Sequence, residues 1–191
     1  LLPEFVWQMP LLRREELVRS SREEAVVLLD AGVIERNIRH WDFTVLVTAA
    51  DLRGHYKTDA IAVVSRSLEG TVVSTCRIDP KAAAAEIDDE QRTARLAKRV
   101  QVLVVHAFAH FCGLGHDDNR QNYMRDFQTA VDLDLAHELT DEQIDALRTD
   151  LREVADQRLE EGAKGKESSF NPLMFYRRAA WINRADIIES L

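Results

Sequence analysis

Three histidines are the residues of this chain whose type and spacing are suited to chemistry. They lie in the stretch VVHAFAHFCGLGHDDNRQNYM, residues 104–124. His106 and His110 are four residues apart, so on a helix their imidazoles project from one face about one turn apart, where two ring nitrogens can share a metal ion. Gly113 is suited to end that helix, and the chain can then return His116 to face the other two. Three neutral imidazoles and an open fourth position make a catalytic zinc site.

Packing is the alternative explanation for any one of these histidines, because a helix histidine is often partly buried without binding anything. The triplet, with a glycine between its second and third members, is hard to explain by packing needs. We therefore predict that His106, His110 and His116 bind one zinc ion.

Composition places these residues in a folded, helix-rich domain. The chain has 191 residues, of which 46% are hydrophobic and 30% are charged, enough for one well-packed domain. It has only 7 glycines and 4 prolines, so helix should be the largest fraction. The formal net charge of −8 repels phosphate backbones, so no nucleic-acid partner is expected.

The cysteine content and the apolar runs bear on the compartment. Cys76 and Cys112 can form at most one disulfide, so a reducing compartment is the default expectation. Cys112 lies among apolar residues of the histidine helix and is expected to be a small core residue. No stretch approaches the roughly 18 consecutive apolar residues of a membrane helix, and the N-terminus lacks a basic region followed by an apolar stretch. We expect a cytoplasmic protein that does not bind membranes.

Hydrophobic periodicity and turn residues predict the elements that position the histidines. They indicate a long amphipathic helix with a break near Gly32, three strands, the helix that carries His106 and His110, and a last helix capped at Thr140. The expected ranges are 12–38 for the first helix, 43–48, 60–65 and 71–78 for the strands, 92–112 for the histidine helix, and 140–161 for the last helix.

This order of elements predicts an α+β fold. A small twisted mixed sheet should have the N-terminal helix as its backing and the active-site helix beside it, followed by a smaller helical C-terminal lobe. We expect two subdomains, residues 1–116 with the zinc-binding helix and residues 117–191 with the last helix. The tail, residues 170–191, is apolar enough to pack on another part of the molecule.

The pattern His106-x-x-x-His110-x-x-Gly113-x-x-His116 resembles the extended zinc-binding motif of the metzincin metallopeptidases. Met124 follows the third histidine at the place where these families have the methionine of their Met-turn. The neighbouring residues are most similar to the archaemetzincin branch: Val72-Val73-Ser74-Thr75 and Arg77 before the helix, and Phe127 and Val131-Asp132 after it. The resemblance is specific over residues 58–132.

The resemblance implies a zinc-dependent endopeptidase with a polypeptide substrate or a protein partner. Its consensus has a catalytic Glu directly after the first histidine, and this chain has Ala107 there. In the family's mechanism that carboxylate takes a proton from the zinc-bound water and returns it to the leaving amine, which alanine cannot do. The chain is therefore expected to be nearly inactive. An engineered inactivating substitution and a natural pseudoenzyme both explain Ala107, and the intact ligands favour the first.

Other roles also come from the resemblance. It implies that Tyr123 stabilises the oxyanion, with a packing role as the alternative, and that the Met124 thioether lies beneath the imidazoles as an apolar floor. It also implies that an edge strand of the sheet pairs with an extended peptide, although the sequence does not identify which strand is the edge.

The chain departs from archaemetzincins after the third histidine. There the family has cysteines that bind a second zinc, whereas this chain has Asp117 and Asn122 at the corresponding positions. We therefore expect one zinc ion only. Residues 139–147 resemble instead the start of the C-terminal helix in matrixin-like members.

Two other functions remain open. Bacterial rRNA-maturation endoribonucleases share the histidine spacing, have a small residue after the first histidine, and carry a Thr-Asp pair comparable to Thr58-Asp59. Their pattern places Asp immediately before the third histidine, where this chain has Gly115, so the peptidase is favoured. The third candidate is a non-catalytic zinc protein that binds peptides without cleaving them.

Overall fold

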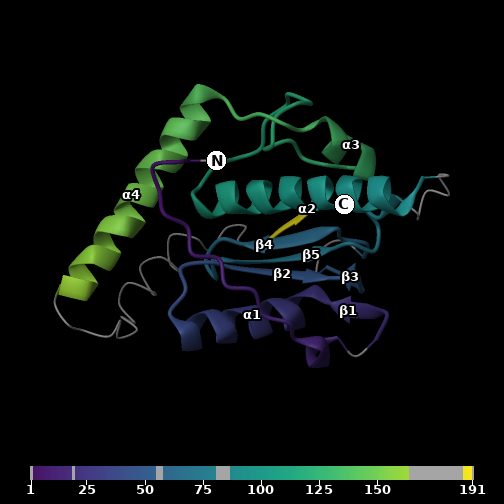
Figure 1. Cartoon of the computed structure of the whole chain (residues 1–191), viewed down its shortest axis with the longest axis horizontal. Coiled ribbons are helices and arrows are strands. Elements are labelled where there is room, and N and C mark those ends of the chain that lie inside the picture. The colour runs from purple at the N-terminus through teal and green to yellow at the C-terminus, as the bar shows by residue number, and fades with distance from the viewer. Residues whose placement is uncertain (1, 19, 55–57, 81–86, 164–186, 191) are drawn as a thin grey trace.

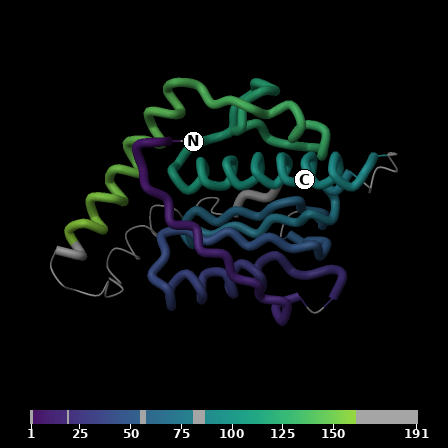
Figure 2. Tube along the Cα trace, viewed as in Figure 1, coloured from purple at the N-terminus to yellow at the C-terminus, as the bar shows by residue number. Residues whose placement is uncertain are grey.

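Three layers make up the fold. The computed structural model describes residues 2–18, 20–54, 58–80, 87–163 and 187–190. A four-stranded sheet lies between helix α1 (Ala25–Arg39) and helix α2 (Asp89–Phe111), as Figure 1 shows. Helix α3 (Ala130–Leu135) lies on the side of α2 away from the sheet, and α4 (Asp141–Ala163) runs along one end of the layers (Figures 1 and 2). The expected α+β fold is confirmed.

The sheet has the strand order β2, β5, β4, β6. Its strands are β2 (Thr44–Thr48), β4 (Ala62–Ser65), β5 (Gly70–Ser74) and β6 (Ile187–Ser190). The pair β2 and β5 is parallel, whereas β4 is antiparallel to both β5 and β6, so the sheet is mixed as expected. Every residue of β4 and β5 is buried, because helices cover both faces of these strands.

Apolar clusters join the layers on both faces of the sheet. Alternate residues of β4 serve different clusters, because successive side chains of a strand point to opposite faces. Val63 packs on α1 in a cluster of Ala25, Leu28, Leu29, Leu52, Ala60, Val63 and Val72. Ala62 packs on α2 in a cluster of Ile61, Ala62, Val73, Ile78, Val102, Leu103, Phe127, Leu133 and Ala136.

A third cluster joins α2 to α4. It consists of Leu2, Ala109, Cys112, Met124, Leu147 and Leu151. Cys112 is buried there, which confirms its expected place in the core, and burial raises the pKa of its thiol. None of the helices in the described ranges combines the length and the apolar character that crossing a membrane requires.

The prediction of a helix over residues 12–38 is wrong in its first half. Helix α1 begins only at Ala25, after a short 3-10 turn (Glu15–Leu17) and strand β1 (Arg22–Glu24). Strand β1 pairs in parallel with β3 (Asp51–Arg53), another strand that the sequence did not predict. Helical periodicity in residues 12–24 is overridden by this tertiary pairing.

Two local features bear on the segment before α1 and on the continuity of the helix. The Ser20 hydroxyl accepts the Arg22 N–H at 3.2 Å, a side-chain bond that competes with helix. The expected break near Gly32 is absent, because α1 is continuous to Arg39. A Cβ at Gly32 would lie 3.3 Å from the Thr44 Cγ2, so glycine allows the helix to lie close to β2.

The three predicted strands and the last two predicted helices are confirmed with shifted ends. Strand β5 ends at Ser74 rather than residue 78, because a turn follows in which the Asp79 N–H bonds to the Thr75 carbonyl at 3.0 Å. Thr140 caps α4 as expected, accepting the Gln143 N–H at 3.3 Å while the Gln143 Oε1 accepts the Thr140 N–H at 2.9 Å.

Two elements in the C-terminal part of the chain were not predicted. Helix α3 begins with a capping box between Thr129 and Asp132. Strand β6 comes from the tail and joins the sheet of the expected first subdomain, while residues 164–186 of that tail lie outside the described residues. The division into residues 1–116 and 117–191 stays a prediction.

Candidate metal centre

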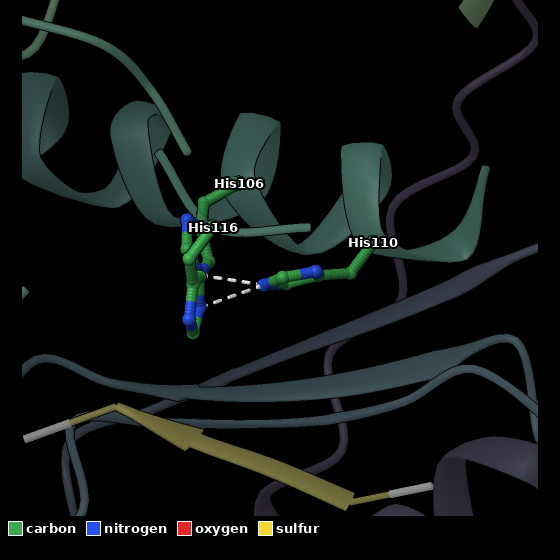
Figure 3. Close-up of side chains that lie close together, drawn as sticks. All are labelled: His106, His110 and His116. Atoms are coloured by element: carbon green, nitrogen blue, oxygen red, sulfur yellow. Dashed lines mark hydrogen bonds between the residues drawn. The ribbon is translucent and has the colours of Figure 1, made fainter. Parts of the chain in front are cut away.

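Helix α2 and the turn after it bring the three histidines together. Asp88 caps the start of α2 by accepting the Gln91 N–H at 2.8 Å, and the last turns of the helix carry His106 and His110. Gly113 ends the helix in the left-handed conformation, with a φ of 85°. The chain then turns back and presents His116 to the other two imidazoles (Figure 3).

The Nε2 atoms of the three imidazoles converge (Figure 3). The His110 Nε2 lies 3.0 Å from the His106 Nε2 and 3.2 Å from the His116 Nε2. Three nitrogens at about 2.0–2.1 Å from a tetrahedral zinc would be separated by about 3.3 Å. The donor set therefore fits a zinc ion in both atom type and spacing.

Backbone carbonyls fix the tautomer of the first two histidines. The His106 Nδ1 lies 2.8 Å from the Tyr123 carbonyl oxygen, and the His110 Nδ1 lies 2.8 Å from the Leu114 carbonyl oxygen. A carbonyl oxygen can only accept, so each Nδ1 carries the proton and each Nε2 keeps a lone pair. Such bonds from the far ring nitrogen are typical of metal-bound histidines.

A cation would stabilise the place where these lone pairs meet. The Nε2 lone pairs of His106 and His110 face one another, which is repulsive unless a positive charge lies between them. Burial lowers the pKa of His106 to about 4 and that of His110 to about 3, so at pH 7 neither ring holds an additional proton. A divalent metal ion satisfies the arrangement. His116 is exposed, so solvent has access to this side of the site.

Ala107, next to the first ligand, is buried in an apolar environment. It is 0% exposed and packs with Val64 of β4 and Phe111 of α2. The methyl group provides neither a proton donor nor an acceptor, so position 107 supplies no general base.

The turn that carries Tyr123 and Met124 packs beside the histidine site. The Tyr123 carbonyl orients His106, while its side chain packs against the core cluster between the sheet and α2. Met124 is 0% exposed and packs in the cluster of Ala109 and Cys112 on α2. The oxyanion role of Tyr123 and the floor role of Met124 stay predictions.

A hydrogen-bond network joins this turn to α4. The buried Asn122 accepts the Met124 N–H at 2.7 Å and donates to the Gln143 Oε1 at 2.8 Å. The Gln143 amide in turn donates to the Asp117 carboxylate at 3.3 Å, and the Asp117 N–H bonds to the Met124 carbonyl at 2.9 Å. Asp117 and Asn122 are thus connected through Gln143.

Gln143 is the supporting residue that sequence reasoning missed. It bonds to Thr140 at the capped start of α4. That its side chain also reaches Asn122 and Asp117 depends on how α4 packs, for which the sequence carries no local pattern.

Comparisons with known proteins agree with this architecture. No protein-family model and no curated protein sequence matches the chain. The fold is similar to an archaemetzincin from Methanopyrus kandleri, with a TM-score of 0.55 and 20% identity over 73% of each chain. It is also similar to a zinc-dependent peptidase from Methanocorpusculum labreanum, with a TM-score of 0.50 and 24% identity over 59% of this chain.

The regions of similarity span only part of these proteins. This chain covers 57% of the Methanocorpusculum peptidase, less than two thirds of its length. An archaemetzincin from Archaeoglobus fulgidus, in a complex with malonate, is 18% identical with a TM-score of 0.49. The match with a TM-score of 0.55 confirms the archaemetzincin resemblance at the level of the fold. The chain has an archaemetzincin-like fold.

Proposed function

We propose that this chain binds one zinc ion and is an archaemetzincin-like endopeptidase that lacks its general base. The observation that carries the proposal is the convergence of three imidazole Nε2 atoms, two of them in tautomers fixed by backbone carbonyls. Asp117 and Asn122 are engaged with Gln143, which supports a single zinc ion rather than two.

Each residue has a distinct role in this proposal. His106, His110 and His116 hold the metal, and the carbonyls of Tyr123 and Leu114 keep the first two imidazoles in the ligating tautomer. When bound, zinc would polarise a substrate carbonyl and lower the pKa of water in its open position.

The missing step is proton transfer. A side chain at position 107 follows the first ligand directly, and in an active enzyme it would accept a proton and deliver it to the leaving amine. Ala107 does neither, so we expect the chain to hold metal and peptide but to hydrolyse peptide bonds very slowly. The complete ligand set supports the view that Ala107 replaces a glutamate in an otherwise intact site.

Restoring the base tests this proposal. Ala107→Glu should raise the rate of hydrolysis of unfolded polypeptides by about 10²–10⁴, the contribution of a positioned acid-base group. Ala107→Gln is the matched control, because it has the same shape without the proton acceptor and should stay inactive. Chelation of the metal, or the additional change His110→Ala, should abolish the restored activity.

A second candidate is a zinc protein that binds peptides without cleaving them. The observation that favours it is the burial of Ala107 against Val64 and Phe111, where alanine completes an apolar contact. Zinc-loaded Ala107→Glu protein that folds but cleaves no polypeptide would support this candidate. Cleavage of RNA alone, in an assay run alongside, would contradict the peptidase and support an endoribonuclease.

A further inference from the structure

Strand β4 has a second partner at the outer edge of the sheet. On one side it pairs with β5, and on the other it pairs antiparallel with β6, Ile187–Ser190. The register places Ala62 opposite Ser190 and Val64 opposite Ile188. Within the described ranges, β6 is the last strand of this sheet, so it covers an edge that β4 would otherwise present.

This edge lies beside the candidate metal centre. Val64 of β4 packs on Ala107 and Phe111 of α2, so the strand runs next to the helix turn that carries His106 and His110. In Figure 3 the imidazoles of His106 and His110 project from α2 toward the sheet, and the β6 ribbon lies on that side of the helix. The C-terminal strand therefore occupies the edge beyond β4, on the side of α2 from which His106 and His110 project.

The backbone pattern shows which groups β6 uses. The N–H of Ser74, the last residue of β5, donates to the Ile61 carbonyl at 2.8 Å, and the Thr71 hydroxyl donates to the Val63 carbonyl at 3.0 Å. Both carbonyls therefore face β5. In a strand, the N–H and C=O of one residue share a side and those of the next face the opposite side. The main-chain groups of Ala62 and Val64 therefore face β6.

An extended peptide binds a sheet edge through these same groups. Two strands cannot use the N–H and C=O of Ala62 and Val64 at once. We propose that Ile187–Ser190 is an intramolecular competitor that keeps substrate off the β4 edge, so that the chain's own C-terminal strand inhibits the site. That the excluded peptide is a substrate rests on the proposed function, whereas the occupation of the β4 edge by β6 does not.

Two proline substitutions in the full chain test whether β6 occupies the β4 edge. The Ile188 N–H faces β4 and the Glu189 N–H faces away, by the same alternation. Ile188→Pro removes a bond to β4, and Glu189→Pro is the matched control, since proline is tolerated where the N–H of an edge strand points outward. Hydrogen exchange of individual amides, followed by NMR, gives the first readout.

We expect Ile188→Pro to speed exchange of the Ala62 and Val64 amides by about 10-fold or more, the effect of losing a main-chain bond at this edge. The Val63 and Ser65 amides face β5 and should keep their protection in both variants. Equal protection of the Ala62 and Val64 amides in Ile188→Pro, Glu189→Pro and the unaltered chain would overturn the proposal.

Binding of a synthetic peptide gives the second readout. A fluorescent peptide of residues 186–191 should bind Ile188→Pro at least about 10-fold more tightly than Glu189→Pro, because only the first variant has a free edge. N-methylation of the peptide at Ile188 should abolish binding, and N-methylation at Glu189 should not. Equal affinity for the two protein variants would contradict competition at this edge.

Activity separates the two proposals. In the Ala107→Glu background, Ile188→Pro should raise kcat/KM for an extended peptide relative to Glu189→Pro. If Ala107→Glu cleaves no peptide, the proposed function fails, and the exchange and binding results still decide whether the C-terminal strand blocks the edge. Active Ala107→Glu protein with the same kcat/KM in both proline variants would refute the inhibition.

Discussion

Replacing Asn122 with alanine is expected to weaken both the fold and the metal centre. Asn122 is 0% exposed, and its amide holds the turn whose Tyr123 carbonyl orients His106. Asn122→Ala removes the acceptor of the Met124 N–H and the donor to the Gln143 Oε1. The turn then loses its connection to α4 and its fixed geometry.

The lost hydrogen bonds set the expected change in the free energy of unfolding. Leaving the buried Met124 N–H without an acceptor costs about 1–3 kcal/mol. Loss of the bond to Gln143 costs about 0.5–1.5 kcal/mol, because its Oε1 still accepts the Thr140 N–H. The free energy of unfolding should fall by roughly 2–4 kcal/mol in total, which lowers the Tm by about 4–16 °C for a chain of this size.

Urea denaturation and zinc titration measure the two consequences. Zinc affinity should fall by about 10-fold or more, since the carbonyl that orients a ligand histidine is displaced. Gln121→Ala is the control, because that side chain is exposed and the change keeps the backbone bonds of Gln121. Its N–H donates to the Asn119 Oδ1, and its carbonyl accepts the N–H groups of His137 and Glu138. If Asn122→Ala and Gln121→Ala differ by less than about 0.5 kcal/mol in free energy of unfolding, the supporting role assigned to Asn122 is refuted.

Three further changes have distinct expected outcomes. His110→Ala should lower zinc affinity by more than about 100-fold, whereas loss of the exposed His137 should leave it unchanged, as measured with a chelating competitor. Met124→Leu should cost less than about 1.5 kcal/mol of stability and Met124→Gln should also weaken zinc binding; equal zinc affinity in both would refute the floor role. Asp134→Ala should cost about 3–5 kcal/mol at pH 7, because it leaves the buried Arg99 without its carboxylate. Burial alone would raise the pKa of Asp134, but the bonds from Arg99 and Arg95 outweigh it and the pKa is lowered. The contribution of Asp134 to stability is therefore complete above its unfolded pKa of about 4 and is lost as the pH falls through the folded value. The difference in free energy of unfolding between Asp134→Ala and the unaltered chain, measured by urea denaturation, should therefore shrink as the pH is lowered. A difference that stays constant would contradict the pairing of Asp134 with Arg99.

Features set by neighbouring residues in the sequence were predictable. The histidine motif spans a single helix end and turn, so its spacing alone brings His106, His110 and His116 together. Strands β2, β4 and β5 follow from their β-branched residues, and the end of α2 follows from Gly113.

Features that depend on distant partners were not predictable. Strand β1 forms because Arg22–Glu24 finds a partner in Asp51–Arg53, against the helical periodicity of its own segment. Strand β6 pairs with β4 from the far end of the chain, and Gln143 reaches Asn122 only because α4 packs beside the turn. In these cases packing geometry, rather than local preference, selects the structure.

X-ray absorption at the zinc edge, on the full chain loaded with one equivalent of zinc, tests the zinc centre most directly. Three imidazole nitrogens at about 2.0–2.1 Å and one oxygen are expected around the metal. The spectrum of the His116→Ala variant should show one imidazole fewer or no bound zinc. A sulfur ligand, fewer than three imidazoles in the unaltered chain, or failure to bind an equivalent of zinc would contradict the assignment of His106, His110 and His116 as the metal site.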